Sequence, residues 1–386
     1  MSGENNGAAD ELIIEMVEAE RYEEALGFDH GASRRERTAA FIRLSARHSG
    51  QDRVLIALNK ARNALLSETE EDKGLRLSVL SHLDRVIRQE ADLAEYEHAL
   101  TEDPEDSLVW HNKGLTLHEL GRHQEALEAF DRALAIDPDD SAIWLRRGLA
   151  LDKLGRHEEE IAAYNQALAI DPESRIAWVN KAITLRQLGR YAEAVDAFDR
   201  ALTIDPMHSA TWFQKGLSLE KLGRHVEELA AYDHALAIDP KDSNVWYFKG
   251  VTLGHLGRHE EALNAYDRVI AINAGYANAW HNKARTLSQV GRHQEAIEAF
   301  NRAIAIDPRN SAQWFQKGQA LEHLGARDAA LEAYDRALAI DPSSVLAANA
   351  RKDLYEKIVS LRSTRPTSQA RSKLAWWSKW LVRTKK

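Results

Sequence analysis

The stretch SLVWHNKGLTLHELGRHQEALEAFDRALAIDPDD, residues 107–140, holds the pattern that decides the fold. Its first half places Trp110, Gly114 and Leu117 at helical spacing, which predicts a helix with one apolar face. Gly121 is expected to end this helix, because glycine adopts the left-handed capping conformation at low cost. The first helix is expected to begin at Ser107, whose hydroxyl can accept a hydrogen bond from the first turn and so act as the N-cap. The first half of the stretch therefore predicts one short helix followed by a tight turn.

The second half of the same stretch predicts a second helix. Asp137-Pro138 is expected to end the second helix, because proline disfavours helix in the residue before it. Apolar residues fall on one side of this second helix: Ala126, Leu127, Phe130, Ala133, Leu134 and Ile136. The 34 residues thus form a predicted helical hairpin.

This hairpin recurs along the chain. Tryptophan returns every 34 residues without exception, at Trp110, Trp144, Trp178, Trp212, Trp246, Trp280 and Trp314. With Ser107 as position 1, seven full units run 107–140, 141–174, 175–208, 209–242, 243–276, 277–310 and 311–344. A single hairpin is too small to bury its own apolar face, so neighbouring units are expected to stack as a solenoid.

The repeated pattern resembles the tetratricopeptide repeat family over residues 107–344. The residues that carry the resemblance in the first unit are Trp110, Gly114, Leu117, Ala126, Phe130, Ala133 and Pro138. The resemblance implies an all-α fold, an α-solenoid in which helix-turn-helix hairpins wind into a right-handed superhelix. It also implies a protein–protein interaction scaffold or adaptor. This chain departs from the family pattern at Ala182 and Ala284, which replace glycine, and at Asn273-Ala274, which replaces Asp-Pro.

Position 7 is a further departure, because the family usually has leucine there and this chain always has a base. We expect the stem of each base to pack while its charged end reaches water or a carboxylate, such as the position-25 aspartate of its own hairpin. The bases are Lys113, Arg147, Lys181, Lys215, Lys249, Lys283 and Lys317.

The segments outside the seven units are weaker matches. Residues 73–106 are predicted to be a degenerate repeat, with 73–89 as its first helix. Residues 1–72 are predicted to be a helical region, with eroded repeats as one interpretation. Residues 345–361 are expected to form a helix that caps the last unit, as such arrays need. Residues 362–386 form a basic, tryptophan-rich tail.

Charge and composition narrow the partners. The formal net charge is −9, yet residues 362–386 carry eight bases and no acid, so the rest of the chain is strongly acidic. An acidic body argues against nucleic acid as a partner, since phosphate binding needs a concentrated basic surface. The absence of cysteine excludes disulfides, thiolate nucleophiles and cysteine-ligated metals. We therefore expect other proteins or peptides to be the partners.

A peptide-binding face is suggested by the resemblance, because positions 2, 5, 6, 9, 12 and 13 line the concave groove in that family. Carboxamides can hydrogen-bond a peptide backbone whatever its side chains. They dominate position 6 here, interrupted by Arg146 and Phe248. The alternative is that they are solvated polar residues. The predicted ladder is Asn112, Asn180, Gln214, Asn282 and Gln316.

Positions 5 and 9 supply an apolar strip in units two to five. A contiguous exposed apolar strip marks a binding surface, whereas tight winding of the solenoid would bury it. Units six and seven are more polar, with His281, Arg285 and Gln319 at these positions. The carboxylate clamp of other family members needs lysine at position 5, which never occurs here. The predicted strip is Leu145, Leu149, Val179, Ile183, Phe213, Leu217, Tyr247 and Val251.

The tail offers an alternative function. Trp376, Trp377 and Trp380 alternate with bases, which suits an anchor at an anionic membrane surface and makes the protein a membrane-peripheral assembly factor. The tail could equally occupy the groove of its own acidic body, or form an additional capping helix. All three interpretations stay open at this stage.

No residue pattern predicts catalysis, a metal site or a cofactor. Histidine recurs at position 17, but equivalent atoms in neighbouring repeats lie roughly 10 Å apart, too far to share one metal ion. We expect these histidines, His123, His157, His225, His259 and His293, to be structural. The protein is expected not to be an enzyme, and the minor alternative places an activity in the N-terminal region. Without a signal sequence or an apolar span, we expect a cytoplasmic protein, membrane-associated if the tail is an anchor.

Overall fold

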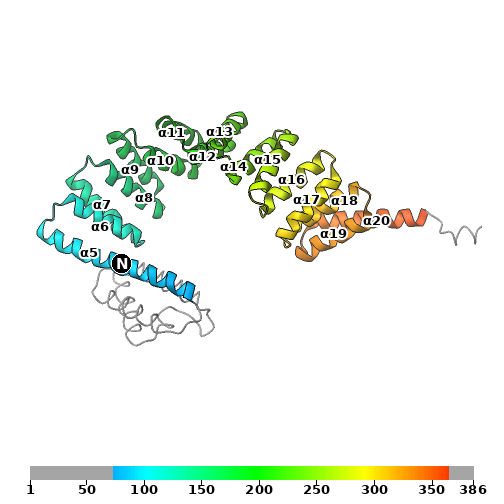
Figure 1. The fold of residues 1–386 in the computed structure, drawn as a ribbon, viewed down its shortest axis with the longest axis horizontal. Helices are drawn as coiled ribbons and strands as arrows, with labels where there is room; N and C mark the ends of the chain where they lie inside the picture. Colours follow the sequence, from blue (N-terminus) through cyan, green and yellow to red (C-terminus); the bar gives the residue numbers. More distant parts are fainter. Residues whose placement is uncertain (1–72, 365–386) are drawn as a thin grey trace, which may run out of the picture. The chain divides into compact units, whose positions relative to one another are not determined.

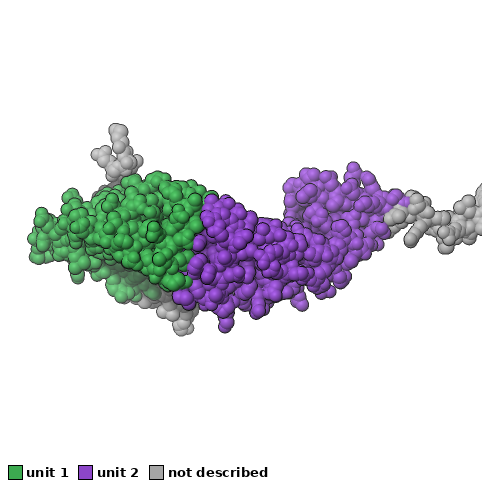
Figure 2. Space-filling model, turned by 90° about the horizontal axis from the view of Figure 1, so that it is seen from above, with its two compact units in different colours: residues 1–206 green, residues 207–386 purple. Residues whose placement is uncertain are grey.

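The computed structural model describes residues 73–364, and the structural statements below concern that range (Figure 1). The chain divides into two compact units, residues 1–206 and 207–386, coloured green and purple in Figure 2. Each unit is described by itself.

Both units are built from helices, and all regular structure in residues 73–364 is helical. Unit 1 contains α5 (Lys73–Glu102), α6 (Ser107–Glu119), α7 (His123–Ile136), α8 (Ser141–Lys153), α9 (His157–Ile170), α10 (Arg175–Gln187) and α11 (Tyr191–Ile204). Unit 2 contains α12 (Ser209–Lys221), α13 (His225–Ile238), α14 (Ser243–His255), α15 (His259–Ile272), α16 (Ala277–Gln289), α17 (His293–Ile306), α18 (Ser311–His323), α19 (Arg327–Ile340) and α20 (Val345–Thr364). The prediction of an all-α repeat fold with seven 34-residue hairpins is confirmed.

Each first helix begins and ends through local backbone chemistry. The N-cap of α6 is Asp106, whose carboxylate accepts the N–H of Val109, so the prediction of Ser107 as the cap is wrong. Ser107 is the first helical residue, and its hydroxyl donates instead to the Ala133 carbonyl at 3.3 Å. Gly121 ends the helix as predicted, with a positive φ of 79°.

A close approach of the two helices holds each hairpin together. A Cβ at Gly114 would lie 2.5 Å from the ring of Phe130, which is completely buried. Glycine at position 8 therefore lets the aromatic ring at position 24 reach the backbone of the first helix. The third and sixth repeats have alanine instead of glycine at position 8, Ala182 and Ala284, and both alanines are fully buried.

Neighbouring hairpins within a unit are joined by the repeated tryptophan. The indole N–H of Trp110 donates to the carbonyl of Pro104 in the preceding repeat at 2.9 Å, and the indole N–H of Trp144 donates likewise to the carbonyl of Pro138. Ala274, which replaces proline, accepts the same bond from Trp280 at 3.0 Å. The backbone carbonyl makes this contact, so the substitution leaves it intact.

The basic position 7 belongs to the same junction. Each base lies over the tryptophan ring one turn before it on its own helix, as Lys181 does over Trp178 at 5.0 Å. Arg147 pairs with Asp131 at 2.7 Å, and Asp131 belongs to the preceding hairpin. The expected pairing within one hairpin is therefore wrong. Positions 4 and 7 share the side of the first helix that faces the previous unit.

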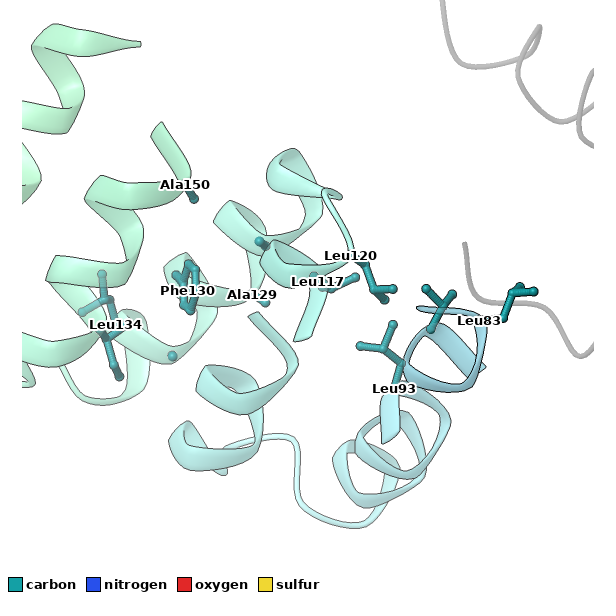
Figure 3. Close-up of a cluster of buried hydrophobic side chains, with 12 residues drawn as sticks. Leu83, Leu93, Leu117, Leu120, Ala129, Phe130, Leu134 and Ala150 are labelled. Carbon is teal, nitrogen blue, oxygen red and sulfur yellow. The ribbon is translucent and has the colours of Figure 1, made fainter. Parts of the chain in front are cut away.

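The degenerate repeat 73–106 differs from its expected hairpin, because α5 is one uninterrupted helix of 30 residues. Its interior after Gly74 has no glycine or proline to form a turn near residue 90. Both halves of α5 still pack on the first hairpin, and Figure 3 shows Leu83 of the first half and Leu93 of the second half beside Leu117 and Leu120.

The predicted capping helix corresponds to α20, which runs to Thr364. Leu354 and Ile358 are buried against Ala330 and Tyr334 of α19. Arg351 pairs with Asp335, the position-25 aspartate of the last hairpin. α20 thus packs on α19 as the first helix of a further hairpin would, and it covers the apolar end of the seventh repeat.

Candidate functional site

First helices contact one another along one side of each unit. In unit 1, α6 contacts α8, and in unit 2, α14 contacts α16, which contacts α18. Neighbouring second helices do not contact to this extent. We call the surface formed by positions 2, 5, 6, 9, 12 and 13 of the first helices the inner face.

The predicted carboxamides lie on the inner face but do not behave alike. Asn112, Asn180, Gln214 and Gln316 are half-buried. Asn282 is only 8% exposed and donates its amide N–H to the hydroxyl of Tyr247 at 3.0 Å. Asn282 is thus already committed to a contact inside the protein, and the other four carboxamides keep a solvent-accessible part.

The predicted apolar strip is half-buried along its length. In unit 1, Val179 and Ile183 pack on one buried cluster of the core and Leu145 on another. Leu149 is half-buried beside them. In unit 2, Phe213, Leu217, Tyr247 and Val251 are half-buried in the same way. The strip keeps part of each side chain accessible while the rest supports the core.

Aromatic side chains gather on the inner face of unit 2 and at the turn next to it. Phe213 and Phe248 have ring centroids 5.5 Å apart, and Phe248 and Tyr247 are also 5.5 Å apart. Tyr276 stacks on Tyr247 at 5.2 Å. We call these four half-buried rings the aromatic patch. It draws together α12, α14 and the residue before α16.

Two members of the aromatic patch were not predicted as site residues. Phe248 stands at position 6, where the sequence showed only a gap in the carboxamide ladder. Tyr276 stands at position 34 of unit five, and an aromatic residue at that turn position was the signal that could have identified it.

A polar pocket of about 250 Å³ follows on the inner face of the last two repeats. From α16 it is lined by Arg285, Ser288 and Gln289, and from α18 by Gln316, Gln319, Ala320 and His323, with Phe300 of α17 beneath. Nearby, burial and then the charge of Arg285 lower the pKa of His281. The pocket therefore holds a positive charge on Arg285, which disfavours protonation of His281.

The turn histidines are half-buried, in keeping with a structural role. His157 lies 3.0 Å from Glu160, a carboxylate only 2% exposed that also accepts the hydroxyl of Thr184 at 2.5 Å. His225 lies 2.9 Å from the buried Glu228 in the same way. One ligand atom each from Asp152, His157 and Glu160 lie within 4.8 Å of one another. Two of the three are hydrogen-bonded to each other, and Asp152 pairs with Lys153 at 2.8 Å.

The remaining predictions fall outside the described residues. Trp376, Trp377 and Trp380 belong to the tail beyond Thr364, and residues 1–72 precede α5. Within residues 73–364, no helix combines the length and apolar character that crossing a membrane requires.

Comparison with known families gives a consistent result. Two family profiles, both described as tetratricopeptide repeat, match residues 105–173 with 242–309 and residues 179–243 with 281–345. No curated protein sequence is significantly similar to the chain.

Solved structures are similar to this chain at low sequence identity. The C-terminal part of a TPR repeat-containing protein from Cytophaga hutchinsonii is 14% identical with a TM-score of 0.55, covering 61% of this chain and 97% of that one. YrrB, described as a TPR protein with an unusual peptide-binding site, is 23% identical with a TM-score of 0.45, covering 50% of this chain and 99% of that one. The likeness to the Cytophaga hutchinsonii protein concerns the fold alone.

Proposed function

Because the chain belongs to the tetratricopeptide repeat family, whose members generally act as non-catalytic protein-interaction scaffolds, we propose that it binds a partner polypeptide on its inner face. The partner lies there as an extended peptide or as a helix. The observation that carries this proposal is the aromatic patch of unit 2, formed by Phe213, Tyr247, Phe248 and Tyr276.

The aromatic patch suits an apolar side chain of the partner. Its rings contact each other at 5.2–5.5 Å between centroids, so their positions are fixed before a ligand arrives. Fixed rings lose little conformational entropy on binding. Burying a Leu or Phe side chain of the partner against them contributes roughly 1.5–3 kcal/mol. Aromatic residues in such a setting are typical centres of protein interfaces.

Polar groups beside the apolar residues would hold the backbone of the partner. Gln214 lies one position from Phe213 on α12, and its side-chain oxygen is buried without a hydrogen-bond partner among the described residues. Such an oxygen can accept a peptide N–H from the partner. In unit 1, Asn112 and Asn180 supply carboxamides next to the aliphatic strip, so each unit offers both kinds of contact.

The proposal can be tested by site-specific photocrosslinking in the full chain. Phe248 is replaced by the photoreactive residue p-benzoylphenylalanine, which preserves an aromatic ring at that position. The matched control carries the same residue at Val226, which lies on the second helix α13 of the same unit and is 80% exposed.

We expect position 248 to crosslink to one defined segment of a partner protein, identified by mass spectrometry, and position 226 to give no such product. Equal labelling at both positions, or no product at position 248, rules out the inner face as the binding surface.

A further inference from the structure

The inner face of unit 2 changes from apolar to polar along the array. In the fourth and fifth repeats, positions 5 and 9 hold apolar residues, Phe213, Leu217, Tyr247 and Val251. In the sixth and seventh repeats, position 9 holds Arg285 and Gln319, and both side chains line the polar pocket. A ligand that follows the inner face therefore meets the aromatic patch first and the polar pocket next.

Three polar atoms in the pocket are buried without a hydrogen-bond partner in the described part of the chain. They are the Nε of Arg285, the hydroxyl oxygen of Ser288 and the side-chain oxygen of Gln316. Arg285 and Ser288 are one turn apart on α16 and so point to the same side of the helix. Buried polar groups are normally satisfied, so a ligand with complementary polar groups would be favoured in this pocket.

The pocket also has charge without a counter-charge. Its eight lining residues include Arg285 and no aspartate or glutamate. Among residues 73–364, no carboxylate pairs with Arg285, unlike the arginines of the turns, such as Arg292, which pairs with Glu295 at 2.7 Å. A partly buried guanidinium without an anion favours an anionic ligand.

We propose that this pocket binds the carboxylate of an aspartate or glutamate in the partner peptide. A carboxylate only accepts hydrogen bonds, so it matches the two donors on α16, the Arg285 N–H and the Ser288 hydroxyl. The oxygen of Gln316 on α18 accepts a backbone N–H next to the acidic residue. The volume of about 250 Å³ suits one side chain and is below the range of pockets for drug-sized molecules.

The geometry also limits the spacing of the two contacts in the peptide. Neighbouring hairpins are separated by about 10 Å, the usual helix-packing distance. An extended chain advances about 3.3–3.6 Å per residue, so about three residues span one repeat. The aromatic patch centres on α14 and the pocket lies between α16 and α18, one to two repeats further. We therefore place the acidic residue about three to six positions from the apolar one.

This inference rests on the proposed function, and the test keeps the two separate. The full chain is used to select from a phage-displayed library of random 12-residue peptides, alongside the variants Arg285→Gln and Arg336→Gln. Arg336 is the matched control, because it is an exposed arginine on the second helix α19 of unit seven. Melting temperatures of both variants are measured to verify folding.

We expect the wild type and Arg336→Gln to enrich peptides with an apolar residue and an acid at the stated spacing. The Arg285→Gln variant should keep the apolar preference and lose the acid. Peptides with an apolar residue but no acid preference overturn this inference and leave the proposed function standing. No enrichment at all rejects both.

A titration of one selected peptide gives the second readout. Replacing its acid by the matching amide should weaken binding to the wild type by about 10- to 100-fold, as expected for a hydrogen-bonded charge. The same replacement should not affect binding to Arg285→Gln. An equal loss in both proteins overturns the proposal, as does a phosphoserine at this position that binds more tightly than the acid.

Discussion

The junction between hairpins can be tested at Trp178, which joins the third repeat to the second. Its indole N–H donates to the Pro172 carbonyl at 2.9 Å, and the ammonium of Lys181 lies 5.0 Å from the ring centroid. Replacing Trp178 by phenylalanine removes the N–H and part of the aromatic surface. The preceding hairpin carries Asn165 at position 25, so Lys181 lacks the aspartate available to Lys249, which pairs with Asp233.

The expected cost follows from these contacts. The lost hydrogen bond contributes about 1 kcal/mol, and the weakened cation–π contact about 0.5–1 kcal/mol. Burial lowers the pKa of Lys181, so the ammonium already has a desolvation cost that offsets part of the second contribution. Trp178→Phe should therefore lower the local stability of the junction by about 2 kcal/mol, including the smaller ring area.

Native-state hydrogen exchange is the appropriate assay, since repeat arrays open in parts and a single unfolding free energy is poorly defined. Amides of α9 and α10 should exchange about 30-fold faster, the equivalent of about 2 kcal/mol. Gln187→Ala, an exposed change on α10, should stay within about 0.5 kcal/mol of the wild type. If Trp178→Phe changes exchange in α9 and α10 no more than this control does, our description of the junction is refuted.

Three further predictions follow from the structure and the sequence. Gly148→Ala should destabilise the second hairpin by about 1–2 kcal/mol, because its Cβ would lie 2.3 Å from the buried ring of Tyr164, whereas Gly254→Ala, which has room, should stabilise the fifth hairpin by about 0.5–1 kcal/mol. Native-state hydrogen exchange of the amides in each hairpin measures both effects, and equal effects contradict the packing argument. Burial and the charge of Arg285 lower the pKa of His281 in the folded state, so the unfolded chain binds the proton more readily and the stability should fall as the pH drops below about 6.5. His281→Leu should therefore reduce the difference in melting temperature between pH 7.5 and pH 5.5. An unchanged difference would contradict this role of His281. The membrane interpretation of Trp376, Trp377 and Trp380 requires the full chain, but not a 1–361 truncation, to float with phosphatidylserine-containing vesicles; identical behaviour of the two proteins excludes that anchor.

The repeat could be predicted from sequence because its period is strict. Tryptophan every 34 residues fixes the register, and Gly121 with Asp137-Pro138 fixes the helix ends within each unit. The end of α6 at Gly121 agrees with this reasoning. Where the period fails, in residues 73–106, the prediction of a hairpin failed as well, since a degenerate pattern does not reveal that a turn is absent.

Contacts between units were harder to predict than the units themselves. Spacing placed a base at position 7 and an aspartate at position 25, but not which hairpin would supply the aspartate. The structure assigns Asp131 to Arg147 of the next unit. The N-cap was misassigned for a related reason: Asp106 and Ser107 are both good caps, and only the hydrogen bonds distinguish them.

The inner-face residues combine both situations. Family positions located the half-buried strip and carboxamides, but they gave no reason to group Phe213, Tyr247, Phe248 and Tyr276 into one aromatic patch. That grouping depends on ring distances between residues of the fourth and fifth repeats, which both lie in unit 2. The unpaired atoms of Arg285, Ser288 and Gln316 depend on which neighbours are missing, which no residue pattern can show.

The most direct test of the central claim measures the affinity of the crosslinked partner segment by fluorescence anisotropy for wild type and for Phe248→Asn. Asparagine is the natural choice, because it occupies position 6 in units one, three and six. We expect the variant to keep its helical content and to bind at least tenfold more weakly, as losing an aromatic contact at an interface centre implies. Unchanged affinity in the folded variant would contradict binding at the aromatic patch.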